Sequence, residues 1–298
     1  MKKLVVITGA SSGIGESVAK RMSQAGHPVL LLARRSQITE GFHLPDSLCR
    51  SVDVTDLAAM KAAIAEAESL YGKTDLLINC AGVMLLDNPY DQDYAEWQQM
   101  VDVNINGVLT GINIVLHDMV ERQEGTIINI SSIAGRKTFP SHSVYCGTKF
   151  AVHAITENIR EEVASANVRL ITIAPGVVET PLLSHTTNEE IKQNYQTWKK
   201  EIQSGLDPEK IADCIQFAYQ QPQDVCIREI VIAKTRQAGG GSGTVPVPEC
   251  SPERRGPADR CSPRRFSAVR GYWWQKSETV GYQPGKYNRT VVCAGFPA

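Results

Sequence analysis

The chain contains 298 residues, of which 42% are hydrophobic and 21% are charged, so it can build a packed core and is not expected to be disordered as a whole. Its 31 basic and 32 acidic residues leave a net charge of -1, which excludes a generally basic nucleic-acid binder. The longest apolar run, Pro28 to Ala33, is much shorter than the roughly 18 residues of a membrane span, so no membrane association is predicted.

The beginning of the sequence has the charge of a signal peptide but not its apolar core. Lys2 and Lys3 precede an apolar stretch that Thr8-Gly9 ends too early for export. We therefore expect a cytoplasmic protein whose eight cysteines are reduced thiols. No two cysteines are spaced as CxxC, so we predict no metal site.

The composition changes near residue 238. A Gly-Gly-Gly-Ser-Gly run at 239–243 is typical of a flexible linker, and residues 239–298 contain 9 Gly, 7 Pro, 9 basic and 4 acidic residues. We predict one domain over 1–238, a linker over 239–243, and a basic Pro/Gly-rich tail over 244–298 that is mostly disordered, a fusion or a translated non-coding stretch. The alternative is a basic interaction module that combines charge with stacking, through Arg254, Arg255, Arg264, Arg265, Tyr272, Trp273 and Trp274.

Strand-like and helix-like segments alternate along residues 1–238. Apolar, β-branched runs predict strands at Leu4–Ile7, Val29–Leu32, Ser51–Val54, Leu76–Ile78, Thr126–Ile130, Val168–Ile173 and Ile227–Ile232. The segments between them predict helices at Gly15–Ala25, Leu57–Tyr71, Trp97–Arg122, Gly147–Ala166 and Pro208–Gln220. The alternation indicates a three-layer α/β fold, a doubly wound parallel sheet of Rossmann-like type, with its ligand at the carboxyl ends of the strands.

A glycine-rich turn joins the first strand to the first helix. Its sequence, Thr-Gly-Ala-Ser-Ser-Gly-Ile-Gly at 8–15, has the spacing GxxxGxG rather than GxGxxG. Glycines permit a tight turn and a close approach of phosphates, and the helix N-terminus offers unpaired N–H groups. The turn predicts a pyrophosphate site with contacts from Gly9, Ser11, Ser12, Gly13, Ile14 and Gly15.

The ends of the next strands indicate which dinucleotide binds. Arg34 and Arg35 follow the second strand, where folds that prefer NAD carry an acid, and a guanidinium suits a 2′-phosphate. NADP(H) is therefore favoured, with Arg34 the stronger candidate. Asp53 is placed to accept a hydrogen bond from the adenine amino group. Further close approaches to the cofactor are expected from Val54, Asn79, Ala81 and Gly82.

A tyrosine and a lysine stand one helical turn apart. Tyr145 and Lys149 are at i and i+4 of a predicted helix and so share one face. A phenol has an ordinary pKa of about 10, and a nearby ammonium is expected to lower it, so that the pair can exchange protons near neutral pH. Ser132, after the fifth strand, is placed to hold a carbonyl oxygen, although ordinary turn chemistry explains it as well.

Together these motifs resemble the short-chain dehydrogenase/reductase family over residues 1–238. The resemblance rests on Thr8–Gly15, Asn79–Gly82, Val103–Gly107, Ser132, Tyr145 with Lys149, and Pro175-Gly176 with Thr180. It implies hydride transfer between NADP(H) and a small carbonyl or alcohol substrate, in a homodimer or homotetramer. A departure is Cys80, where the family commonly has a second Asn, and we expect it to be a packing residue.

The resemblance also implies a role for each matching side chain. Tyr145 would give or take the proton, Lys149 would bind the nicotinamide ribose and tune Tyr145, and Ser132 would orient the carbonyl. Asn104 would anchor a water in a proton relay. The nicotinamide half of the cofactor would be lined by Pro175, Gly176 and Thr180.

A second resemblance and the substrate segment leave alternatives open. Gly26–Pro28, Leu30–Arg35 and Ile128–Ala154 resemble a subgroup known as blue fluorescent proteins, which implies blue emission from rigidly held NADPH with little or no turnover. The stretch from Pro181 to about Asp207 is expected to form a helical lid, and its aromatic residues fit either substrate contact or lid packing. His142 is placed equally well toward the substrate or on the surface.

Overall fold

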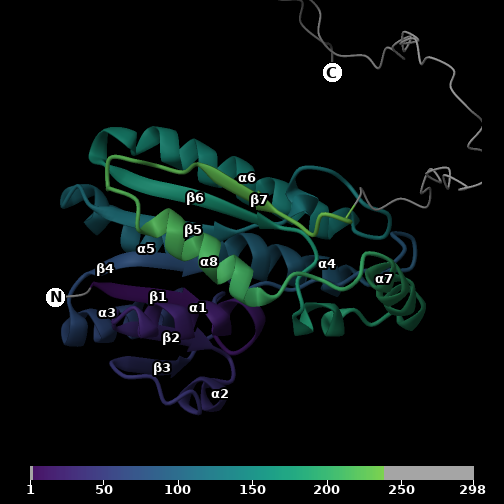
Figure 1. Ribbon diagram of the computed structural model, residues 1–298, viewed down its shortest axis with the longest axis horizontal. Coiled ribbons are helices and arrows are strands. Elements are labelled where there is room, and N and C mark those ends of the chain that lie inside the picture. Colours follow the sequence, from purple (N-terminus) through teal and green to yellow (C-terminus); the bar gives the residue numbers. More distant parts are fainter. Residues whose placement is uncertain (1–2, 238–298) are drawn as a thin grey trace, which may run out of the picture. The chain divides into compact units, whose positions relative to one another are not determined.

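The computed structural model describes residues 3–237, so the predicted linker and tail lie outside the described residues. Seven parallel strands form one sheet in the order β3-β2-β1-β4-β5-β6-β7 (Figure 1). The strands are β1 (Leu4–Thr8), β2 (Val29–Ala33), β3 (Ser47–Ser51), β4 (Thr74–Asn79), β5 (Gly125–Ile130), β6 (Val168–Pro175) and β7 (Glu229–Ile232). The strand order reverses between β1 and β4, and a fold of this kind binds its ligand at that point.

Helices cover both faces of the sheet and make it the middle of three layers. The helices are α1 (Gly13–Gln24), α2 (Ser36–Glu40), α3 (Leu57–Tyr71), α4 (Tyr94–Val101), α5 (Gly107–Glu121), α6 (Ser143–Glu162), α7 (Glu189–Glu201) and α8 (Pro208–Tyr219). The predicted three-layer doubly wound fold is confirmed. No helix among residues 3–237 is both long and apolar enough to cross a bilayer.

Two hydrophobic cores lie on opposite faces of the sheet because successive strand residues point to opposite sides. In β1, Leu4 and Val6 pack against α3, α5 and α6, whereas Val5 and Ile7 pack against α1 and α8. All four side chains are fully buried. The near-continuous apolar runs in the sequence are thus the mark of strands covered on both faces.

Three predicted boundaries are wrong. β3 pairs with β2 through 47–51, whereas Val52 and Val54 of the predicted strand are buried against the α3 side without joining the ladder. The single helix predicted over 97–122 is interrupted by a π-helical turn at Asp102–Asn106 that separates α4 from α5. Helix α6 starts at Ser143 rather than at Gly147, which places Tyr145 in its first turn.

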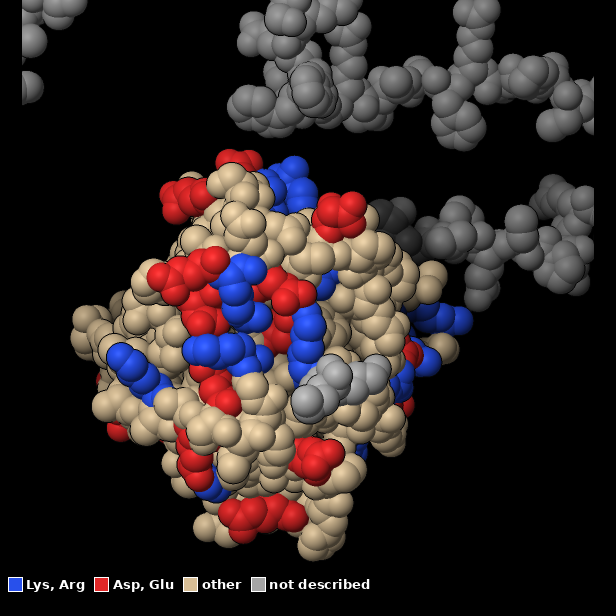
Figure 2. Space-filling model, turned by 90° about the vertical axis from the view of Figure 1, so that its left-hand side faces the viewer, with Lys and Arg blue, Asp and Glu red and all other residues tan. Residues whose placement is uncertain are grey.

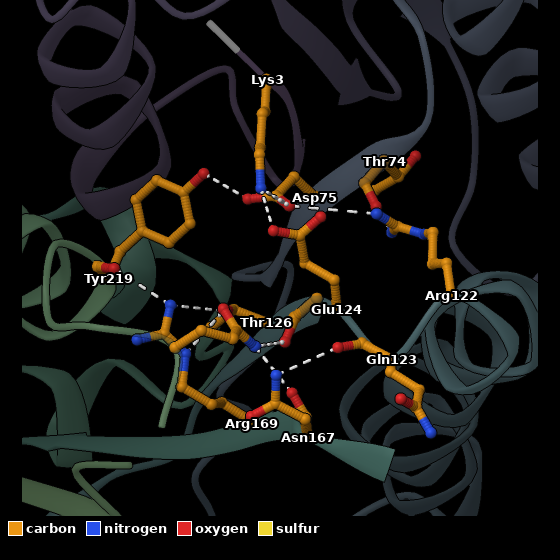
Figure 3. A network of polar contacts seen from close by, with 12 residues as sticks. Lys3, Thr74, Asp75, Arg122, Gln123, Glu124, Thr126, Asn167, Arg169 and Tyr219 are labelled. Carbon is orange, nitrogen blue, oxygen red and sulfur yellow. Dashed lines mark hydrogen bonds and ion pairs between the residues drawn. The ribbon is translucent and has the colours of Figure 1, made fainter. Parts of the chain in front are cut away.

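A polar network ties the sheet together at the amino ends of its strands (Figure 3). The buried Arg169 of β6 donates to Thr126 Oγ1 of β5 at 3.0 Å and to the carbonyl of Tyr219 at 3.0 Å. Tyr219 in turn donates its hydroxyl to Asp75 of β4 at 2.6 Å, and Lys3 pairs with Asp75 at 3.1 Å. Since Arg169 is only 3% exposed, these bonds replace the water that its guanidinium loses on folding.

Replacing Arg169 with Leu should lower the free energy of unfolding by about 3 kcal/mol, because Thr126 and several carbonyls lose a buried donor. Urea denaturation measures this loss. Arg228→Leu is the matched control, since Arg228 pairs with Glu157 while 61% exposed and should cost less than about 1 kcal/mol. Equal losses in the two variants would contradict a structural role for the network.

Charges on the same side of the molecule are mixed in sign. Figure 2 shows acidic and basic side chains interspersed on the side where the chain enters β1, without a continuous area of one sign. Lys73 pairs there with Asp118 at 2.9 Å, and Arg122 pairs with the same carboxylate at 2.8 Å. The charges at this end therefore form local pairs.

Candidate active site

A cavity of about 1600 Å³ opens at the carboxyl ends of the strands. It is larger than the roughly 300–1,000 Å³ of a usual small-molecule site, so it has room for a cofactor and a substrate together. Its lining includes most of the residues predicted for the site: Gly9, Ser11, Ser12, Gly13, Ile14, Arg34, Arg35, Asp53, Val54, Ala81, Gly82, Ser132, Tyr145, Lys149, Pro175, Gly176 and Thr180. The predicted residues Gly15, Asn79 and Asn104 lie outside this lining.

The glycine turn brings three backbone segments close together. Gly9 has a φ of +66°, and a Cβ there would lie 2.7 Å from the Cα of Ala81. Gly13 has a φ of +55°, and a Cβ would meet Thr180 Cγ2 at 2.7 Å. A Cβ at Gly15 would lie 2.3 Å from the carbonyl oxygen of Gly9, so Gly15 lets α1 pack on the turn. The first two glycines thus let the turn approach the loop after β4 and Thr180 closely, and the third acts behind the turn.

Thr8 connects this turn to the loop after β4. Its hydroxyl accepts hydrogen bonds from the N–H groups of Cys80 at 3.0 Å and Ala81 at 3.1 Å. The Asn79 side chain points into the sheet instead, where it donates to Asn129 Oδ1 at 2.8 Å. Burial raises the pKa of Cys80 to about 12, which suits the predicted packing role. Sequence reasoning missed the contacts of Thr8 because a threonine at a strand end has no distinctive pattern.

The two arginines follow β2, in the half of the sheet formed by β3, β2 and β1, whereas Tyr145 belongs to α6. Arg34 and Arg35 are exposed and both line the cavity. Asp53 accepts from the N–H of Thr55 at 3.0 Å and from its hydroxyl at 2.8 Å, and these bonds keep its pKa below the usual range. Asp56, and not Asp53, caps α3. One oxygen of Asp53 therefore remains available to a ligand.

The π-helical turn presents Asn104 to the loop that follows β4. Its side chain accepts from the N–H of Val83 and donates to the carbonyl of Val83, both at 2.9 Å. It also donates to Thr148 Oγ1 at 3.2 Å. Asn104 is fully buried, so the turn locks this loop onto α6 beside Lys149. π turns are rare within α-helices, and those that occur are often found at functional sites.

Tyr145, Lys149 and Ser132 meet on one wall of the cavity. Lys149 Nζ lies over the Tyr145 ring, 5.8 Å from its centroid, and donates to the carbonyl of Ile130 at 3.0 Å. A Cβ at Gly82 would approach Nζ to 3.8 Å, so the lysine lies beside the loop after β4. Burial lowers the pKa of Lys149 to about 8. The structure thus places Tyr145 and Lys149 on one face of α6, as their spacing predicts.

The expected direction of the Tyr145 pKa is wrong. Burial raises the pKa of Tyr145 above its ordinary value, and the neighbouring Tyr195 acts in the same direction. A hydrogen bond with Ser132 opposes this shift but does not reverse it. Lys149 lies over the ring rather than at the hydroxyl, so removal of the phenol from water outweighs the attraction of the ammonium. Tyr145 is a neutral phenol near pH 7, which is the form that donates a proton.

The other side of the cavity is formed by the end of β6 and the segment after it. Gly176 and Thr180 line it, and Thr180 caps the short turn at Pro181–His185. Gln237 also reaches this wall, where its side-chain oxygen accepts from the N–H of Val177 at 3.0 Å. Sequence reasoning did not find Gln237 because it lies at the end of the described chain, far from every motif.

The helix predicted within the stretch after Thr180 is present as α7. Its cap, Asn188, donates to Asp87 at 2.7 Å, and Thr186 donates to the carbonyl of Met84 at 3.1 Å. His142 lines the cavity, with its ring 6.2 Å from the ring of Tyr145. Of the two placements left open for His142, the structure selects the cavity. Figure 1 shows α7 beyond the carboxyl ends of the strands.

Comparison with known proteins assigns the family. The sequence model of the short chain dehydrogenase family matches residues 3–191 of this chain. An uncharacterized oxidoreductase of Staphylococcus saprophyticus is 39% identical over 242 residues, which are 79% of this chain and 97% of that protein. One of Listeria monocytogenes is 36% identical over 243 residues, again 79% and 97%. The chain therefore belongs to the short-chain dehydrogenase family and is an oxidoreductase that binds a nicotinamide cofactor.

Solved structures support the same class. The closed form of serine dehydrogenase complexed with NADP+ has a TM-score of 0.73 and 28% identity, covering 81% of this chain and 98% of that one. ElxO with NADP bound has a TM-score of 0.69 and 27% identity, covering 78% and 97%. The fold is thus shared with proteins whose solved structures hold NADP.

Proposed function

We propose that this protein is an NADP(H)-dependent reductase of small carbonyl compounds that uses Tyr145 as its proton donor. The observation that carries the proposal is that Tyr145, Ser132 and Lys149 share one cavity with the glycine turn and the two arginines. The residues present suit the cofactor, because the glycine turn at the start of α1 offers N–H groups to a pyrophosphate and the two arginines offer guanidinium groups to a 2′-phosphate. The solved structure of a tyrosine-to-phenylalanine variant of ElxO with NADPH bound shows that such a variant of a neighbour can hold the cofactor.

Each side chain then has a defined task. NADPH, when bound, supplies a hydride to the carbonyl carbon and is oxidised to NADP+. Tyr145 gives its phenolic proton to the carbonyl oxygen, and the product is an alcohol. Ser132 donates to the same oxygen as negative charge develops on it. Lys149 stabilises the tyrosinate until it recovers a proton from solvent, and Asn104 keeps the loop beside Lys149 in place.

Replacing Arg34 with Ala should weaken NADPH binding by about tenfold while leaving NADH binding within about twofold, because only NADPH carries the 2′-phosphate. Calorimetric titration with each coenzyme measures the two dissociation constants. Arg35→Ala is expected to have the smaller effect. Arg228→Ala, outside the cavity, is the control. Equal weakening of NADPH and NADH binding would contradict a phosphate contact at Arg34.

Enhanced emission of bound NADPH is the second candidate function. It is supported by the lining of the site, because Val83 and Met84 of the loop after β4 and Ile191 and Tyr195 of α7 give the cavity an apolar wall. A dihydronicotinamide held away from water loses less excitation without radiation. Mixing protein with NADPH and recording the emission spectrum tests this; no gain over free NADPH would exclude it. Turnover of carbonyl compounds in the same sample distinguishes the two candidates.

Assembly and location stay predictions. The family resemblance implies a homodimer or homotetramer for residues 1–238, and the composition and the short apolar stretch at residues 4–7 predict a cytoplasmic protein that acts without nucleic acid or membrane. Sedimentation measurements on the full chain would test the assembly.

A further inference from the structure

A histidine lies directly behind the part of the cavity wall that carries Ser132. His153 follows Lys149 by four residues in α6, and its side chain is 16% exposed. Its Nδ1 lies 2.8 Å from Ser131 Oγ and 3.0 Å from the carbonyl oxygen of Lys149. Ser131 Oγ is also 3.1 Å from that carbonyl oxygen. His153 therefore contacts the chain neighbour of Ser132 and the backbone of Lys149.

The same imidazole supports the turn that begins at Ser132. Ser132 caps a short 3-10 turn at Ile133–Gly135, where its Oγ accepts from the N–H of Ala134 at 3.1 Å. A Cβ at Gly135 would lie 2.3 Å from His153 Nδ1 and 2.5 Å from its Cε1. Only glycine allows such a close approach, so the turn packs directly on the ring.

An ion pair holds the ring in this place. Glu229 of β7 lies 3.1 Å from His153 Nε2, and Arg136, the residue after the turn, pairs with the same carboxylate. Burial lowers the pKa of His153, so the ring is neutral near pH 7. Its Nε2–H then donates to Glu229, and Nδ1 accepts the hydroxyl proton of Ser131. Residues 131–136 are thus held at one end by His153 and at the other by Glu229.

Contacts on the cavity side restrain Ser132 less strongly. Its Oγ donates to the carbonyl of Pro175 at 3.4 Å, which is long for a hydrogen bond between oxygen atoms. A group that stabilises a developing charge must be held to within roughly 0.5 Å of its productive position. The short contact between Ser131 and His153 is therefore the better candidate for fixing this stretch.

We propose that His153, held by Glu229, is a positioning residue that sets the place of the Ser132 hydroxyl relative to Tyr145. The inference rests on the proposed reductase function and adds to it a residue that does not touch the substrate. His153 is absent from the lining of the active-site cavity, and it lines a separate hollow of about 650 Å³ together with Glu229. It therefore acts through Ser131 and the turn that follows.

Two variants of His153 test this role. His153→Leu removes both ring nitrogens and should lower kcat at least about tenfold, while the dissociation constant for NADPH stays within about twofold, because a misplaced group costs rate rather than coenzyme contacts. His153→Asn keeps a polar group near the place of Nδ1 and should retain at least about a third of the wild-type kcat. The substrate is ethyl pyruvate, benzaldehyde or diacetyl, whichever the wild type reduces fastest. Oxidation of NADPH measures kcat, and calorimetry measures the dissociation constant.

An exposed histidine provides the matched control. His117 of α5 is 83% exposed and pairs with Glu121, and His117→Leu should change kcat by less than about twofold. An unchanged kcat in His153→Leu would overturn the positioning role. Equal losses in the Leu and Asn variants of His153 would overturn it as well, because the polar contact would then have no effect on the rate.

Removing the partner of the contact gives an independent test, which also serves if His153→Leu does not fold. Ser131→Ala deletes the hydroxyl that faces Nδ1 and should lower kcat by a similar factor. The double variant of Ser131→Ala with His153→Asn should lose no more than Ser131→Ala alone, because groups that act through one contact are not additive. Losses that multiply in the double variant would contradict the proposal.

Turnover by the wild type separates the two levels of inference. If the wild type reduces none of the three compounds with NADPH, the proposed function fails and the positioning role fails with it. If the wild type reduces one of them and both His153→Leu and Ser131→Ala are equally active, only the positioning role fails.

Discussion

Replacing Tyr145 with Phe should lower kcat by roughly 10²–10⁴-fold, because the carbonyl oxygen loses its proton donor while the ring and its packing remain. The dissociation constant for NADPH should stay within about twofold. Stopped-flow or steady-state oxidation of NADPH measures the first quantity and calorimetry the second. The largest loss is expected here because the described cavity wall places Tyr145 beside both Ser132 and Lys149.

The matched control for this variant is Tyr195→Phe. Tyr195 also lines the cavity, and burial raises its pKa to about 12, so this variant removes a second buried phenolic hydroxyl. It should change kcat by less than about threefold. A Tyr145→Phe protein that turns over at the normal rate would refute the assignment of the proton donor.

Replacing Lys149 with Met should stabilise the protein at pH 7 by about 2 kcal/mol while abolishing most of its activity. The folded state holds the pKa of Lys149 at about 8, below the ordinary 10.5, so below pH 8 folding is opposed by roughly 3 kcal/mol. Methionine removes this cost, but it leaves the carbonyl of Ile130 without its donor, which costs about 1 kcal/mol.

The pH dependence of this effect has a definite sign. Between pH 8 and pH 10.5 the unfolded chain binds more protons at Lys149 than the folded protein does, so the stability of the wild type rises with pH across this window. The advantage of Lys149→Met should therefore shrink and disappear near pH 10. Urea denaturation of both proteins at pH 7 and pH 10 measures it.

A surface lysine provides the control for the Lys149 variant. Lys200 is exposed at the end of α7, and Lys200→Met should change the free energy of unfolding by less than about 0.5 kcal/mol at either pH. A Lys149→Met protein that is less stable than the wild type at pH 7 would show that the buried ammonium is better compensated than its surroundings indicate.

Local patterns in the sequence were sufficient for the sheet and for the glycine turn. The apolar runs predicted the strands because a strand that is buried on both faces consists almost entirely of apolar residues. Only β3 was misplaced. The turn at Gly9 and Gly13 was readable because positive φ values and close backbone contacts select glycine. The spacing of Tyr145 and Lys149 likewise needs only the helix repeat.

Features that depend on contacts between segments far apart in the chain could not be predicted from the sequence. The π turn at Asn104 exists where its side chain bonds to Val83, and nothing in the helical pattern of residues 97–122 marks it. The placement of the Asn79 side chain inside the sheet depends on Asn129, 50 residues further along the chain. The contact of Gln237 with Val177 joins the end of β6 to the residues after β7.

The alternation of strands and helices, the doubly wound fold and the family followed from the amino-acid sequence by itself, because each depends on periodicity or on short spacings. The tertiary structure alone decided how acidic Tyr145 and Lys149 are. The pKa of a side chain depends on how much water the packing of remote elements removes, and no local spacing contains that information.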